Sequence, residues 1–385
     1  MKKLLALLLA LLMIASMLVA CKPDTPVGPE DPDTPDTPTD PSTPTTPDKP
    51  VVPDTPTGTQ PGLYTPTAQK QRETYELVTA EGCEDGPYLV ETVYVSEQVI
   101  IANVIVTPEK YGVDPTGKED STAGIQQALD DCRALGGGTV FLPVGQYVVT
   151  KTLKVPYGVV LQGDWQDPDL TATPEYGTML LCKMAPLSDE ETFDPTASPL
   201  IELLHETDGN NGVIGMTFYY PDQDIKDVKP YGYTIYGGKP RMAMLRDLTF
   251  INSYQGIGAC LGGEGTHELL QVENVRMTVL NMGYKASLSR EIGYTVDLRI
   301  SPRYWADAAE GFACPDPAAL RDFCRSYAIG LEFYGLDLNQ YTDILVESCH
   351  TAMLSQQGFW GVFYDVQIKD CRYGCVAEAS TLARA

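Results

Sequence analysis

Positive charge and histidine are scarce in this chain of 385 residues. It holds 27 Lys and Arg against 52 Asp and Glu, a formal net charge of −25 at pH 7, and only 3 His. So acidic a chain repels polyanions, and we expect neither nucleic acid nor an anionic bilayer surface as an electrostatic partner. The His are scattered and no CxxC spacing occurs, so no metal site is predicted.

A long apolar run is missing after residue 21, so no membrane-spanning helix is expected there. Residues 1–21 combine a basic start with the apolar run Leu4–Leu18 and small residues before Cys21. This run is shorter than the ~20 residues of a spanning helix. The pattern fits a bacterial lipoprotein signal with a lipobox, in which Cys21 becomes the lipid attachment site. We therefore expect an exported protein, anchored in the membrane at the cell surface by its N-terminal lipid.

Apolar residues are also nearly absent from residues 22–62, a repetitive tract of Pro, Thr and Asp. Such a tract cannot bury a core, so we predict an extended, disordered stalk. Residues 63–110 contain the apolar runs Tyr88–Val95 and Val99–Val106, which we expect to be lead-in strands. The remaining residues, 111–385, are predicted to form one domain.

Ten cysteines are present, and nine remain if Cys21 is acylated. An exported protein permits disulfides, but an odd count leaves at least one thiol free. The pairs Cys314/Cys324 and Cys371/Cys375 are close enough in sequence to join.

The stretch 111–165 contains the clearest local pattern. A turn-rich loop at 113–120 precedes a helix that Ser121 or Thr122 can cap, and Gly136–Gly138 end it. One apolar face recurs at helical spacing: Ile125, Ala128, Leu129, Cys132 and Leu135. Short strands are expected at Thr139–Leu142, Tyr147–Val149 and Val159–Gln162.

This stretch resembles the N-terminal signature of the pectate lyase superfamily domain, which rhamnogalacturonase-like and epimerase-like proteins share. The resemblance lies in Gly124–Asp130 (GIQQALD), Gly136–Gly138 and Val140–Tyr147 (VFLPVGQY), while residues 114–122 depart from the usual GDGxTDDT. It implies an all-β fold, a right-handed parallel β-helix with an N-terminal capping α-helix. It implies no particular reaction.

Residues 166–199 are rich in Pro, Asp and Thr and are expected to leave the coil as an excursion. Beyond residue 213 a polar-or-Gly, apolar, variable, apolar unit recurs. The expected central apolar residues are Met216, Leu248, Val275, Leu298, Leu336 and Val366. Alternation places these residues inward and the following ones outward on stacked rungs. Asp247, Asn274, Asp297 and Asp365 precede four of them, a repetition that favours a turn over a catalytic role.

The outward positions suggest where chemistry could occur. Arg276, Arg299 and Asp337 are expected in neighbouring rows, and residues 276–303 are locally basic. Guanidinium groups pair well with uronate carboxylates. The predicted substrate-binding residues are Arg276, Lys285, Arg299, Arg303 and Trp305. The alternative is that these bases form ion pairs within the protein.

A glycoside hydrolase needs two carboxylates in different roles. The predicted catalytic residues are Asp297, Asp337, Asp343 and Glu347. The N-x-D, D-D, G-H-G and R-x-K motifs by which polygalacturonases resemble one another are not intact here. A polysaccharide lyase could instead use Arg299 or Lys285 as a base with Ca²⁺ on acidic residues; otherwise no cofactor is expected.

Two functions remain open. One is a surface-anchored enzyme acting on a polysaccharide substrate, such as the uronate-containing pectin. The other is a non-catalytic surface protein that binds glycans or mediates adhesion. No capping helix follows the expected rung Val362–Ile368, so we also expect a C-terminal continuation or a partner chain that covers it.

Overall fold

The computed structural model describes residues 86–94, 99–187, 194–205, 209–259, 268–289, 292–309 and 311–377. The expected signal, Cys21, the stalk and the start of the lead-in lie outside these residues. No helix in the described ranges is long and apolar enough to span a membrane.

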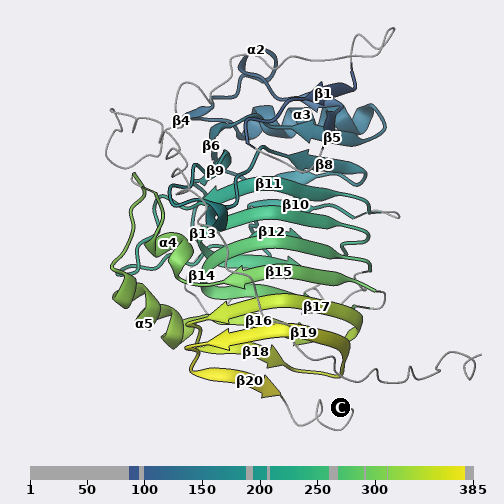
Figure 1. Cartoon of the computed structure of the whole chain (residues 1–385). Coiled ribbons are helices and arrows are strands. Elements are labelled where there is room, and N and C mark those ends of the chain that lie inside the picture. Colours follow the sequence, from purple (N-terminus) through teal and green to yellow (C-terminus); the bar gives the residue numbers. More distant parts are fainter. Residues whose placement is uncertain are drawn as a thin grey trace, which may run out of the picture. The chain divides into compact units, whose positions relative to one another are not determined.

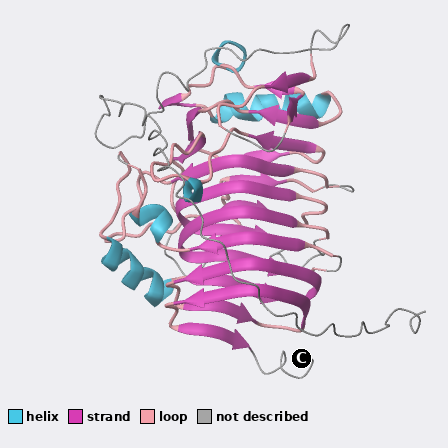
Figure 2. Ribbon diagram, in the orientation of Figure 1, coloured by secondary structure: helices cyan, strands magenta, loops and turns pink. Residues whose placement is uncertain are grey.

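The described chain forms a right-handed parallel β-helix, as predicted. An 18-stranded sheet holds β3 to β20, and its interstrand pairings are parallel. The strands stack into successive rungs, with the helices confined to one end and one side (Figures 1 and 2). Before this sheet, β1 (Tyr88–Val90) pairs antiparallel with β2 (Ile100–Ala102).

The remaining elements have the following bounds. The helices are α2 (Pro108–Tyr111), α3 (Thr122–Ala134), the 3₁₀ helix η1 (Pro168–Leu170), α4 (Arg303–Ala306) and α5 (Pro317–Tyr327). The first strands of the large sheet are β3 (Val104–Ile105), β4 (Thr116–Asp120), β5 (Gly138–Phe141), β6 (Gly145–Val149), β7 (Leu153–Val155), β8 (Val159–Gln162), β9 (Thr178–Cys182) and β10 (Ile201–Leu203). The later ones are β11 (Gly212–Tyr219), β12 (Tyr233–Gly237), β13 (Met244–Ala259), β14 (Gln271–Ser287), β15 (Tyr294–Ile300), β16 (Ile329–Tyr334), β17 (Leu336–Glu347), β18 (Thr351–Ser355), β19 (Phe359–Lys369) and β20 (Tyr373–Ala377).

The inward row of apolar residues follows the predicted register, with one exception. Met216 pairs with Leu248, and the row continues through Val275 to Leu298. These four side chains are fully buried, so each rung closes the core of its neighbour. The next member is Ile344, which pairs with Leu298 and with Val366; the prediction of Leu336 was wrong.

Each of these rungs turns at a residue with a left-handed backbone. We call this set the corner row: Gly215, Asp247, Asn274, Asp297, Asp343 and Asp365. Their φ angles lie between 53° and 70°. Gly, Asn and Asp tolerate this conformation better than other residues, which explains the repetition seen in the sequence.

The expected helix is present as α3, and its buried face contains Ile125, Ala128, Leu129 and Cys132. Two details differ. Leu135 is exposed, because the helix ends at Ala134. Ser121 occupies the cap position, but its hydroxyl accepts from the Asp114 N–H at 2.9 Å, and Asp120 accepts from the Thr122 N–H at 3.0 Å instead.

Two further expectations were wrong. The segment 166–199 is more than an excursion, because it contains the fully buried core strand β9. Cys314, Cys324, Cys371 and Cys375 are free thiols, and the register places Met353 rather than Cys371 opposite Cys375.

Candidate functional site

The outward residue two positions after each corner forms a second row across the rungs, which we call the outward row. Thr217 pairs with Thr249, Thr249 with Arg276, and Arg276 with Arg299, as predicted. The next position is Leu345. Asp337 therefore does not stand beside Arg299, because it lies six positions before Asp343 on β17.

A segment from early in the chain covers this row. Trp165 donates from its indole Nε1 to the Thr249 hydroxyl at 2.9 Å. Arg276 pairs with Asp167 at 2.8 Å and with Asp169 at 2.9 Å, and its side chain is only 5% exposed. A residue that faces away from the coil interior is thus buried under residues 165–170.

Asp297 links the two stacked arginines. Its Oδ2 accepts from Arg276 Nη2 at 2.8 Å, and its Oδ1 accepts from Arg299 Nε at 2.8 Å. Arg299 also donates from Nη2 to both oxygens of Asp343 at 2.8 Å. The Asp297 and Asp343 carboxylates, one rung apart, are therefore joined through a single guanidinium group.

Arg303, at the start of α4, completes the network by pairing with Asp169 at 2.7 Å. We call the whole set the ion-pair cluster: Asp167, Asp169, Arg276, Asp297, Arg299, Arg303 and Asp343. It contains three bases and four acids, a formal charge of −1. The expectation of a basic groove at residues 276–303 was therefore wrong. Asp167, Asp169 and Asp343, which lie outside this range, neutralise its arginines.

Arg276 is held firmly in its charged form. Burial disfavours its charge, but the hydrogen bond to Asp297 and the charges of Asp167 and Asp297 outweigh burial and raise the Arg276 pKa. This side chain is therefore unsuited to act as a proton-abstracting base.

Two of the predicted substrate-binding residues, Lys285 and Trp305, lie outside the ion-pair cluster. Lys285, on the second half of β14, pairs with Glu332 at 2.7 Å, and its register partners are Gly258 and Glu332 rather than residues of the outward row. Trp305 is buried, and its Nε1 donates to the Ala313 carbonyl at 3.0 Å. The prediction of Trp305 as a substrate-binding residue was wrong, because its ring is buried in the core.

The remaining predicted carboxylates also have separate environments. Glu347, at the end of β17, accepts from the Ser301 hydroxyl at 2.7 Å. The Asp337 Oδ1 is buried and has no hydrogen-bond partner among the described residues. Within the same part of the chain, no three His, Cys, Asp or Glu side chains are arranged to hold a metal ion.

Asp247 is a further member of the site, although the sequence pattern favoured only a turn for it. Burial raises the Asp247 pKa, and the nearby charge of Asp167 adds to this, while Asn274 and Arg246 lower it without reversing the shift. Asn274 Nδ2 donates to Asp247 Oδ1 at 2.7 Å. The Asn274 Oδ1 is buried without a hydrogen-bond partner among the described residues. It offers an acceptor to a water molecule or a ligand hydroxyl group.

The sequence contained little that identifies the covering residues. Asp167 and Asp169 lie in a Pro- and Asp-rich segment that looks like surface loop, and 109 positions separate Asp167 from Arg276. One sequence signal did point to Asp343. It is an Asp at the corner position, like Asp297, so the repeat places the two residues on neighbouring rungs.

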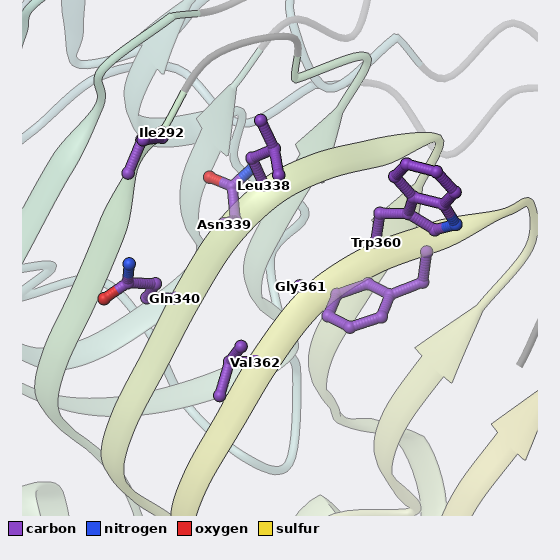
Figure 3. Close-up of a pocket in the computed structure, with 8 residues that line it drawn as sticks. Ile292, Leu338, Asn339, Gln340, Trp360, Gly361 and Val362 are labelled. Atoms are coloured by element: carbon purple, nitrogen blue, oxygen red, sulfur yellow. The ribbon is translucent and has the colours of Figure 1, made fainter. Parts of the chain in front are cut away.

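A cavity of about 360 Å³ opens beside the same sheet, nearer the C-terminal rungs. Figure 3 shows Leu338, Asn339 and Gln340 on β17 and Trp360, Gly361 and Val362 on β19 around it. Trp360 is 62% exposed. It ends an apolar row of exposed side chains at equivalent positions of successive rungs: Met242, Leu269, Ile292, Leu338 and Trp360.

Comparison with protein families agrees with the resemblance seen in the sequence. Residues 105–217 match the model of the rhamnogalacturonase A/epimerase, pectate lyase-like family. The predicted relationship is therefore confirmed over this segment, which includes α3, the first rungs and the cover segment with Asp167 and Asp169.

Individual similar proteins match only over a short segment or at low sequence identity. Over 76 residues, 18% of this chain, the sequence is 37% identical to a mannuronan C5-epimerase from Azotobacter vinelandii, and the match spans 5% of that protein. Similar solved structures include an exopolygalacturonase from Thermotoga maritima, with 10% identity, a TM-score of 0.42, and coverage of 74% of this chain and 78% of that one. The Agl-KA catalytic domain has 10% identity and a TM-score of 0.40, with 73% of this chain and 50% of that one covered.

Proposed function

We propose that this chain, with a rhamnogalacturonase A/epimerase, pectate lyase-like segment at residues 105–217, is a carbohydrate-active enzyme that hydrolyses glycosidic bonds of a polysaccharide. The observation that carries the proposal is the contrast between two corner-row carboxylates. Burial raises the Asp247 pKa, whereas Asp297 lies between two guanidinium groups. Two carboxyl groups in such different environments suit the roles of proton donor and base.

Asp247 is assigned the general acid, because a raised pKa keeps its carboxyl group protonated to higher pH. Asp297 is assigned the general base, because its two carboxylate oxygens are held in place by Arg276 and Arg299, one guanidinium group on each. Asn274, on the rung between them, has a free buried acceptor that can position a sugar hydroxyl group or the attacking water.

The spacing of these residues predicts the stereochemistry. Asp247, Asn274 and Asp297 occupy consecutive rungs, which places the Cα atoms of Asp247 and Asp297 about 9.6 Å apart. Inverting glycosidases hold their carboxyl groups roughly 6.5–9.5 Å apart, and retaining ones only about 5 Å. The Cα separation over two rungs is well above the carboxyl separation of a retaining pair, so we expect inversion at the anomeric carbon.

A lyase mechanism has less support. It needs a base near the proton α to a uronate carboxyl group and a positive charge to stabilise that carboxyl group. Here Arg276 and Arg299 are engaged by carboxylates, and Lys285 is paired with Glu332 away from the cluster.

The substrate is proposed to contain uronic acid. The mannuronan epimerase acts, by its name, on such a polymer. The side chain of Arg303 is 45% exposed at the edge of the cluster and can meet a carboxylate of the substrate.

The test is turnover of galacturonan, rhamnogalacturonan, mannuronan and a neutral glucan by the purified chain. Hydrolysis releases reducing ends without ultraviolet absorbance, and NMR of the first product shows the inverted anomer. The variants Asp247→Asn and Asp297→Asn should each lose at least about 100-fold in kcat. Asn keeps the left-handed corner, as Asn274 does naturally, so both variants should fold.

The matched control is Asp365→Asn, which makes the same change in the same corner row outside the ion-pair cluster. It should keep full activity. An absorbing, unsaturated product would establish a lyase instead. Unchanged activity in Asp247→Asn would remove the assigned acid.

A second candidate, a non-catalytic glycan-binding protein, is favoured by one observation. The exposed Trp360 lies in a cavity beside the apolar row, and an exposed indole can stack on the apolar face of a sugar. Glycan binding without turnover of any polymer would favour this function.

The proposal includes attachment at the cell surface through Cys21, because a polymer too large to be imported must be cleaved outside the cell. Cys21→Ser should block lipid modification and release the chain from the membrane fraction. Equal membrane retention of both forms would contradict the anchor.

A further inference from the structure

Two free cysteines occupy the same position on consecutive rungs. These cysteines are Cys349 and Cys371. Just before them in the chain, Glu347 pairs with Lys369, and just after them Thr351 pairs with Tyr373, so paired residues are 22 positions apart on both sides. This register places Cys349 opposite Cys371. The turn just before each cysteine is also matched, because Ser348 and Asp370 have φ angles of 54° and 52°.

The two residues are in direct contact. The Cys349 backbone N–H donates to the Cys371 sulfur at 3.4 Å. One residue earlier, the Ser348 hydroxyl donates to the Asp370 carboxylate at 3.0 Å. Opposed positions on neighbouring parallel strands have Cα atoms about 4.8 Å apart, within the roughly 4.4–6.8 Å range of disulfides. The backbone is therefore already arranged for a cross-link.

We propose that Cys349 and Cys371 form a disulfide that joins the last two described rungs. The Cys371 thiolate attacks a sulfur of an external disulfide and displaces one thiolate from it. Cys349 then loses its proton to solvent and attacks the Cys371 sulfur, which releases the second thiolate. Two electrons pass from the cysteine pair to the external disulfide, which is reduced to two thiols.

The environments of the thiols suit this order of attack. The hydrogen bond between the two thiols lowers the Cys371 pKa, and backbone N–H groups of Cys349 and Ser348 also favour its thiolate. Cys371 is half-buried, whereas Cys349 is buried. Cys371 therefore meets an external disulfide first, and Cys349 resolves the mixed disulfide.

The other nearby cysteines have different surroundings. Cys324 on α5 is buried, and its thiol donates to the Val279 carbonyl. Cys375 on β20 is exposed, but the residue opposite it is Met353. Cys375 is therefore a control for an exposed cysteine that has no opposed thiol among the described residues.

The experiment uses the purified full chain, first reduced and then incubated with oxidised glutathione. After alkylation and tryptic digestion, Cys349 lies in peptide 326–369, Cys371 in 370–372, Cys324 in 322–325 and Cys375 in 373–384. We expect a covalent link between 326–369 and 370–372 that dithiothreitol removes. Cys371→Ser should abolish it, and Cys375→Ser should leave it unchanged.

Hydrogen exchange provides a second measurement. In the oxidised protein, the amides of β19 and β20 should exchange about tenfold or more slowly than in the reduced protein, because the cross-link restrains fraying of these rungs. The proposal is overturned if Cys371 stops at a glutathione adduct with Cys349 alkylated. A link between peptides 322–325 and 326–369 would overturn it too, since it would make Cys324 the partner.

Discussion

Asp297 accepts a hydrogen bond from Arg276 at 2.8 Å, although the two residues lie 21 positions apart on neighbouring rungs. Arg276 also pairs with Asp167 and is almost completely buried, so its charge is compensated inside the protein rather than by solvent. The cluster therefore holds the cover segment 165–170 on the coil, in addition to shaping the candidate site.

The first prediction concerns this pair. Arg276→Ala should lower the free energy of unfolding by about 3–5 kcal/mol, because it removes the guanidinium group from the Asp167 carboxylate and one of the two guanidinium groups from Asp297. Urea unfolding at neutral pH measures the loss. Arg303→Ala is the control, since its side chain is 45% exposed and should cost at most about 1 kcal/mol. Equal effects of the two variants would contradict a structural role for Arg276.

The second prediction concerns pH. A general acid works while protonated, so activity should fall as pH rises through the raised pKa of Asp247. Asn274 lowers that pKa by donating to the carboxylate. Asn274→Gly removes this bond and suits the left-handed corner, as Gly215 does. The basic limb of the kcat/KM profile should therefore move to higher pH.

The control for that variant is Asp365→Gly, which loosens the backbone at another corner without touching Asp247. Its pH profile should match the wild type. A basic limb that stays in place in Asn274→Gly would show that Asp247 does not set it.

The repeating part of the fold could be predicted because its signal is local. Alternation identified Met216, Leu248, Val275 and Leu298 as one inward row. Alternation did not distinguish Leu336 from Ile344, because two apolar stretches of β17 carry the same alternation. Both stretches also follow a residue with a left-handed backbone, Gly335 before Leu336 and Asp343 before Ile344, so the corner pattern did not separate them either.

The candidate site could be predicted only in part, for a physical reason. The stacking of Arg276 on Arg299 follows from the rung pattern, so it was accessible from the sequence. Their charge partners are not, since Asp167 and Asp169 come from a loop whose path depends on tertiary contacts. Net charge counted along residues 276–303 therefore gave the wrong sign for the surface.

The third prediction concerns the cavity in Figure 3. Trp360→Ala should weaken binding of an oligosaccharide by about 1 kcal/mol, roughly fivefold, through loss of a stacking surface. Isothermal titration calorimetry measures the affinity. Tyr364→Ala is a matched control, because Tyr364 is also an exposed aromatic residue of β19 (70%) but does not line the cavity. Equal losses in both variants would exclude a specific role for Trp360.

The last prediction concerns acid stability at the N-terminal end. The Asp114 carboxylate accepts from the N–H groups of Thr116, Lys118 and Glu119 at 2.8–2.9 Å, and from the Thr116 hydroxyl at 2.7 Å. Burial opposes its charge, but these bonds outweigh burial and lower the Asp114 pKa to about 2. An unfolded Asp has a pKa of about 3.9.

The sign follows from proton uptake. Because the unfolded chain binds the proton more tightly, the stability that Asp114 contributes is complete above about pH 4 and is lost as pH falls toward about 2. Asp114→Asn should lower the free energy of unfolding by about 1–3 kcal/mol at pH 7 and make it less pH-dependent between about pH 4 and 2. Urea unfolding at several pH values tests this. Asp322→Asn, whose side chain is 68% exposed, is the control and should follow the wild type. If Asp114→Asn also follows the wild type down to pH 2, the loop bonds to Asp114 do not stabilise the fold.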